Sequence, residues 1–134
     1  MSDYVADRLA VQDVMLRYAA GVDELDMDMY RSCFADDVEV VGFGADTVHG
    51  GDAWTTYVRG ALERFEATQH MLGPMLASID GDEADCRTDV QAQHFLKDAP
   101  GETLTLWATY KTRMRRVLGE WKIARHELVT RGRK

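Results

Sequence analysis

One carboxylate and two histidines could together carry proton-transfer chemistry. Asp23 closes a long helical pattern, and His70 and His94 lie in segments where apolar and polar residues alternate. An imidazole beside a carboxylate can accept and return a proton near neutral pH, because the carboxylate fixes the ring tautomer. If Asp23 accepts a hydrogen bond from Nδ1 of His70, Nε2 stays available to a substrate. We therefore predict that Asp23, His70 and His94 are catalytic residues.

Each of these residues also has a purely structural interpretation. Asp23 could cap the turn that follows its helix, and a histidine on an apolar face is more often a satisfied core residue than a catalyst. Convergence of all three groups on one cavity would favour catalysis. For the other two histidines, His49 and His126, the sequence suggests no partner carboxylate or histidine, and they are assigned no role.

Three helices are predicted in the first half of the chain, and the first of them must position Asp23. It spans Asp3 to Val22 with Asp3 as its N-cap, followed by helices over 26–34 and 53–67. One apolar stripe of the first helix consists of Val5, Leu9, Leu16 and Ala20, and we expect it to face the core. Asp23 continues this stripe, so its carboxylate is expected to lie near the core. A second stripe consists of Val11, Met15, Tyr18 and Val22.

The rest of the chain predicts strands. A short strand over 38–43 pairs with a segment near Val48, and four long strands follow over 68–79, 83–97, 103–117 and 120–131. Glycine-containing turns separate the long strands, which predicts a meander. In the strand over 83–97 one face is apolar and the other polar. We expect one α+β domain over residues 1–134, with three helices on the concave side of a strongly curved antiparallel or mixed sheet.

Composition excludes several classes of protein. With 46% apolar residues, 29% charged residues and a net charge of −7, the chain predicts a globular domain that repels nucleic acid and anionic membranes. No signal peptide or long apolar run is recognisable, so we expect a cytoplasmic protein. Cys33 and Cys86 have no metal-site or disulfide spacing, so we expect buried, reduced thiols.

Several short motifs resemble a known family through their order and spacing. They are the helix ending at Asp23, TQHML (68–72), DGDEAD (80–85), His94 and GEWKI (119–123). The chain is similar to the SnoaL-like branch of the NTF2-like superfamily, and within it to scytalone dehydratase and its bacterial relatives. The resemblance implies a cone-shaped fold. It also implies a site in which an aspartate orients one histidine and a second histidine completes the site, at positions that match Asp23, His70 and His94.

The chain departs from scytalone dehydratase at two tyrosines that hold a catalytic water there. Val22 precedes the aspartate, and the first strand offers Val40, Val41 and Phe43. Scytalone is therefore not the expected substrate. We expect a cofactor-free lyase or isomerase that acts on a small hydrophobic, cyclic hydroxy- or keto-compound of the polyketide kind, by eliminating water or by moving a proton next to a carbonyl.

Aromatic residues are the predicted ligand contacts. The substrate-binding candidates are Tyr18, Tyr30, Trp54, Tyr57, Phe65 and Tyr110. Tyr30 and Tyr110 are the preferred donors to an enolate oxygen. Met71, Met75 and Trp107 are expected to help line the same apolar cavity. At these spacings such residues are more often plain core than ligand contacts.

The sequence is also compatible with other functions. The domain could be a non-catalytic module that binds a small molecule or another protein. Two histidines and a carboxylate could also hold a divalent metal, although the close His-x-Asp pair common in such sites is missing and we expect none. Family members pair through the outer sheet face, which here would present Gln91, Gln93, Thr105 and Trp107. We expect a homodimer, with a trimer as the alternative.

Overall fold

The computed structural model describes residues 3–44 and 46–134, and the helices come before the long strands in the chain. In order, the elements are α1 (Tyr4–Asp23), α2 (Met27–Ser32), β1 (Phe34–Val41), β2 (Val48–His49), α3 (Gly51–Leu62), β3 (Phe65–Asp80), β4 (Glu83–Leu96), β5 (Thr103–Val117) and β6 (Glu120–Arg133). The predicted α+β class is confirmed.

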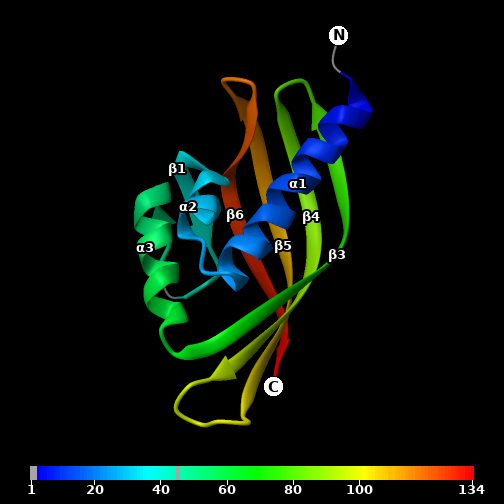
Figure 1. The fold of residues 1–134 in the computed structure, drawn as a ribbon. Helices are drawn as coiled ribbons and strands as arrows, with labels where there is room; N and C mark the ends of the chain where they lie inside the picture. Colours follow the sequence, from blue (N-terminus) through cyan, green and yellow to red (C-terminus); the bar gives the residue numbers. More distant parts are fainter. Residues whose placement is uncertain (1–2, 45) are drawn as a thin grey trace.

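The strands form a single mixed sheet in the order β2-β1-β6-β5-β4-β3. The strands β3 to β6 pair antiparallel with their neighbours in sequence, which confirms the meander, whereas β1 pairs parallel with β6. All three helices lie on one face of the curved sheet, and β3 crosses beneath the C-terminal end of α1 (Figure 1). This crossing determines what Asp23 can contact.

Helix α1 buries only one side. It begins at Asp3, whose carboxylate accepts hydrogen bonds from the amides of Val5 and Ala6. Its buried residues include the second predicted stripe: Val11, Met15, Tyr18 and Val22. Three members of the other stripe are exposed: Val5, Leu9 and Leu16. The prediction that this stripe faces the core was wrong, because α1 rests on the sheet by one side and no described residue covers the other.

Two helix boundaries also differ from the prediction. The second helix ends at Ser32, and Phe34 begins β1 by pairing with Ile123 of β6. The third helix ends at Leu62, and Phe65 begins β3 by pairing with Leu96 of β4. In both places the apolar spacing fits a helix, but pairing with a neighbouring strand overrides that local preference.

An irregularity in β3 sets the direction of its side chains. The pairing register with β4 shifts between Leu72 and Met75, around Gly73 and Pro74. A proline cannot donate to the ladder, and such bulges bend a strand and reverse its inward and outward alternation. In contrast, β4 keeps the predicted alternation, and its buried residues are Ala84, Cys86, Thr88, Val90 and Ala92.

Both cysteines are free and buried, as predicted. Burial raises the pKa of the Cys33 and Cys86 thiols to about 11, so neither is a thiolate near neutral pH. Among the described residues, no helix combines the length and apolar character that a membrane crossing requires.

Candidate active site

Asp23 is the last residue of α1, where the chain turns away from the helix axis. The Glu24 amide donates to the Ala20 carbonyl, and Leu25 adopts a left-handed backbone conformation with φ of 57°. A non-glycine residue in this conformation is uncommon, which marks a tight turn. Because β3 passes this end of α1, the Asp23 side chain meets a strand and is only partly exposed (21%).

Asp23 and His70 are directly hydrogen-bonded. Nδ1 of His70 lies 2.7 Å from Oδ1 of Asp23, and the His70 backbone amide donates to Oδ2 at 2.8 Å. The Thr68 hydroxyl donates to Oδ1 at 3.0 Å. Both carboxylate oxygens are therefore occupied, and the imidazole has one fixed orientation. The hydrogen bonds found among the described residues leave Nε2 of His70 unused.

The hydrogen bonds keep Asp23 ionised. Burial alone would raise the pKa of Asp23, but hydrogen bonds from the ring and amide of His70, with the one from Thr68, outweigh it and hold this pKa below its ordinary value. An ionised carboxylate at Nδ1 selects the tautomer with a proton there, which leaves Nε2 as the basic atom of the neutral ring.

His94 lies beside this pair without bonding to it. Its strand β4 places it opposite Thr68 of β3, and its Nδ1 donates to the Leu104 carbonyl at 3.0 Å. The rings of His94 and His70 are 6.0 Å apart and nearly perpendicular. Burial, with the nearby His70 ring, lowers the pKa of His94 although the Leu104 carbonyl opposes this. His94 is thus neutral near pH 7, with its Nε2 as an acceptor.

A small cavity lies beside Asp23, and neither His70 nor His94 is among the residues that line it. It measures about 80 Å³ and is lined by Asp23, Leu25, Leu62, Phe65, Glu66, Ala67 and Thr68. Pockets that enclose a drug-sized ligand usually measure roughly 300–1,000 Å³. The cavity is therefore smaller than the apolar pocket predicted for a ring-bearing substrate.

Four of the predicted substrate-binding residues form one buried aromatic cluster. Tyr18, Tyr30, Trp54 and Tyr110 are each no more than 2% exposed. The Tyr18 ring lies 4.9 Å from that of Tyr30 and 5.2 Å from that of Tyr110, and Nε1 of Trp54 donates to the Tyr30 hydroxyl at 3.0 Å. Burial raises the pKa of all three tyrosines, so their phenols stay neutral donors. The negative charge of Asp23 also contributes at Tyr110.

Comparison with known proteins identifies the family. The sequence matches the model of the SnoaL-like domain over residues 3–127. The chain belongs to the SnoaL-like family. Among curated proteins, no sequence matches it significantly.

Solved structures share the fold of this SnoaL-like protein. A candidate scytalone dehydratase from Novosphingobium aromaticivorans is 23% identical, with 98% of this chain and 88% of that one covered and a TM-score of 0.90. A hexachlorocyclohexane dehydrochlorinase, LinA-type3 from Novosphingobium barchaimii, is 21% identical, with 98% and 90% covered and a TM-score of 0.87. An NTF2-like protein with a cystatin-like fold from Novosphingobium aromaticivorans is 21% identical, with 96% and 84% covered and a TM-score of 0.82. These likenesses confirm the predicted NTF2-like cone.

The remaining two predicted substrate-binding residues of the SnoaL-like domain lie outside the aromatic cluster. The ring of Phe65 contacts that of His94, with ring centroids 4.7 Å apart. Tyr57 is 48% exposed and stacks on Trp54 with ring centroids 5.4 Å apart. It borders a groove of about 270 Å³, which is lined by Val40, Phe43, Gly44, Asp46, Val48, Trp54 and Tyr57. We call this surface the Tyr57 groove.

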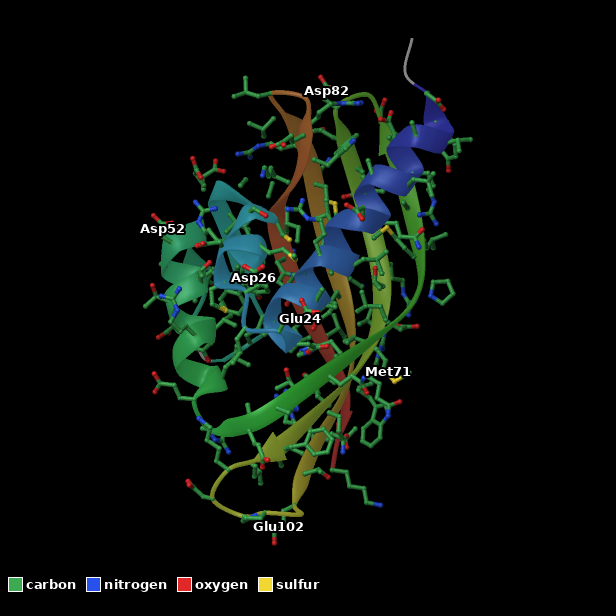
Figure 2. All side chains as sticks on the ribbon, in the orientation of Figure 1. Glu24, Asp26, Asp52, Met71, Asp82 and Glu102 are labelled. Atoms are coloured by element: carbon green, nitrogen blue, oxygen red, sulfur yellow. The ribbon has the colours of Figure 1, made fainter. Side chains whose placement is uncertain are left out.

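Two of the expected cavity residues face outward instead. Met71 is 62% exposed and projects outward from β3 (Figure 2), and Trp107 is also exposed. The bulge at Gly73 and Pro74 explains Met71, because it reverses the alternation between Met71 and the buried Met75. Cross-strand pairs place Gln91 opposite Trp107 and Gln93 opposite Thr105, so the residues predicted for a dimer interface do share one face.

His126 is the residue that sequence reasoning missed. It is fully buried, and its Nε2 lies 2.8 Å from the Tyr18 hydroxyl. Its two-residue spacing from the buried Leu128 was a usable signal. The alternation that starts at the buried Trp121 and Ile123 would place His126 on the exposed face. The register between β5 and β6 shifts before His126, and this shift reverses which residues of β6 point inward.

The arrangement gives a metal ion no obvious ligand set. Within residues 3–44 and 46–134, no group of three or more His, Cys, Asp or Glu side chains is placed to hold one. Both oxygens of Asp23 already accept hydrogen bonds. The geometry instead suits an aspartate that positions a basic imidazole.

Proposed function

We propose that this SnoaL-like protein is a cofactor-free lyase or isomerase in which Asp23 and His70 perform general acid–base catalysis. Its substrate would be a small hydrophobic, cyclic hydroxy- or keto-compound. The observation that carries the proposal is the 2.7 Å hydrogen bond between Nδ1 of His70 and Oδ1 of Asp23, which leaves Nε2 as the base.

The reaction would begin with proton removal next to a carbonyl. Nε2 of His70 takes a proton from that carbon, and the C–H electron pair forms the double bond of an enolate. In an elimination, these electrons expel a hydroxyl group from the adjacent carbon, and the proton on Nε2 passes to it to give water. In an isomerisation, the same proton returns to a different carbon. The negative charge of Asp23 stabilises the imidazolium in either case.

One buried group could stabilise the enolate oxygen, and a second group could contact a substrate hydroxyl. Tyr110 remains a neutral phenol because burial raises its pKa, and a fixed O–H donor lowers the energy of a developing oxyanion. His94 is neutral and lies 6.0 Å from the His70 ring, so it could accept a hydrogen bond from a substrate hydroxyl. Tyr110 is therefore the proposed oxyanion donor and His94 the proposed substrate contact.

The names of the structural relatives agree with this reaction class. One is called a candidate scytalone dehydratase and another a hexachlorocyclohexane dehydrochlorinase. Dehydration and dehydrochlorination both remove a proton from carbon and a leaving group from its neighbour.

Hydrogen exchange tests the proton-removal step without a known substrate. 1-Indanone, a cyclic ketone, would be dissolved in D2O with the protein, and loss of the protons next to its carbonyl followed by NMR. We expect the wild type to accelerate exchange over buffer, and Asp23→Asn and His70→Gln to slow it by roughly 10²–10⁴-fold. His49→Gln is the matched control, because this exposed histidine lies outside the site. If His70→Gln retained the wild-type rate, His70 would not be the base.

A binding module is the second candidate, and the sizes of two pockets favour it. The cavity beside Asp23 measures only about 80 Å³, whereas the Tyr57 groove, which neither Asp23 nor His70 lines, measures about 270 Å³. Binding of 1-indanone with no exchange above buffer would support the binding module against the enzyme.

A further inference from the structure

His126 lies at the centre of the buried aromatic cluster. Its ring centroid is 5.1 Å from those of Tyr18 and Tyr110, 5.0 Å from Phe43 and 6.3 Å from Trp54. It reaches this position from β6, on the same side of the sheet as the helices. A polar ring is thus enclosed by apolar and aromatic surface on several sides.

Only one of its two ring nitrogens has a partner. Nε2 is 2.8 Å from the Tyr18 hydroxyl, whereas Nδ1 is buried and has no hydrogen-bond partner in the described part of the chain. A buried polar atom without a partner costs roughly 1–3 kcal/mol. The other polar side chains of this cluster do not carry that cost, since Trp54 donates to Tyr30 and Tyr18 bonds to His126.

A surface groove lies close to the His126 ring. Phe43 and Trp54 line the Tyr57 groove, and both also contact the His126 ring. His126 therefore lies one side chain below a surface groove of about 270 Å³. Phe43 follows Gly42 in the segment between β1 and β2, and its ring lies between the groove and the His126 ring.

We propose that His126 is a ligand-recognition residue whose Nδ1 hydrogen-bonds a neutral oxygen, a hydroxyl or carbonyl, of a ring-bearing compound entering from the Tyr57 groove. The aromatic rings of Phe43, Trp54 and Tyr57 hold the apolar body of the ligand. This inference rests on the proposed function for the entry of a cyclic ligand, but it does not require that Asp23 and His70 catalyse a reaction.

The surroundings favour a neutral oxygen over an anion. The charged residue that lines the groove is Asp46, and the protein as a whole carries a net charge of −7. Burial lowers the pKa of His126 to about 3, so the ring offers no positive charge at neutral pH. A carboxylate or phosphate would lose its hydration without gaining a cation in return.

Three probes of similar shape separate the possibilities. 2-Naphthol carries a neutral hydroxyl at pH 7, naphthalene has no oxygen, and 2-naphthoate is an anion. We expect 2-naphthol to bind about tenfold more tightly than naphthalene, and 2-naphthoate to bind more weakly than 2-naphthol. In protein with 15N-labelled histidine, 2-naphthol should shift the His126 Nδ1 resonance, and naphthalene should leave it nearly unchanged.

Substitution of His126 provides a second test. His126→Gln should weaken 2-naphthol binding about tenfold and leave naphthalene binding unchanged, whereas His49→Gln should change neither. If His126→Gln does not fold, the wild-type NMR shifts decide alone. Equal affinity for 2-naphthol and naphthalene, no binding of any probe, or a 2-naphthol complex with an unmoved Nδ1 resonance would each overturn the inference. Intact 2-naphthol recognition with no 1-indanone exchange would refute the proposed reaction but not this site.

Discussion

Acidification should destabilise the fold through His126, and the structure gives the magnitude. Burial lowers the pKa of His126 to about 3, whereas the unfolded chain returns it to about 6.5. Between these values the unfolded state binds the additional proton, so stability is lost as the pH falls below about 6.5 and the loss levels off near 3. At about 1.4 kcal/mol per pH unit, lowering the pH from 7 to 4.5 should cost about 2.5 kcal/mol.

Urea denaturation at several pH values measures this loss. The free energy of unfolding would be compared between wild type and His126→Gln, because glutamine does not titrate and can still bond to Tyr18. His94 also has a lowered pKa, and it remains in both proteins, so their difference isolates His126. Asp23 acts in the same direction only at lower pH, since its stabilisation is lost as the pH falls below its ordinary range. Parallel pH profiles for the two proteins would refute the reasoning.

Two further predictions concern the backbone and the outer sheet face. Gly42→Ala should lower the free energy of unfolding by more than 1 kcal/mol, because φ of Gly42 is +91° and the new Cβ would lie 2.3 Å from the Leu128 carbonyl oxygen. The control is Gly101→Ala, since Gly101 has a similar φ of +88° but open space around the new Cβ. Equal losses for the two variants in urea denaturation would contradict the clash. Trp107→Glu places a charge on the outer sheet face and should convert the proposed homodimer to a 15.1 kDa monomer in gel filtration. If the wild-type protein already elutes as a monomer at micromolar concentration, that interface is ruled out.

The local spacing of apolar residues predicted most of the helices and strands. It did not predict which side chains of the bulged strands point into the core. The meander follows from its glycine turns, and each bulge depends on how two strands align over many residues. In β3 the bulge turns Met71 outward while Met75 stays inside. In β6 a similar shift carries His126 into the core. Neither shift can be located from one strand's pattern, because the partner strand determines it.

The hydrogen bond between Asp23 and His70 was expected for a partly mistaken reason. Asp23 was placed near the core by continuing a stripe that includes Leu16, yet Leu16 is half exposed. Its contact with His70 depends on where β3 crosses the end of α1. The catalytic roles of Asp23, His70 and His94 stay predictions until exchange is measured.

The central place of β6 has a consequence for the order of folding. This strand comes last in the chain, yet it lies between β1 and β5 and pairs with both. During synthesis, β1 therefore has no partner along this edge until β6 has emerged. Closing the sheet joins the most distant parts of the sequence, which is a slow, non-local step. A nascent chain that lacks β6 would expose the facing edges of β1 and β5, so this domain should be most prone to aggregation before β6 is available.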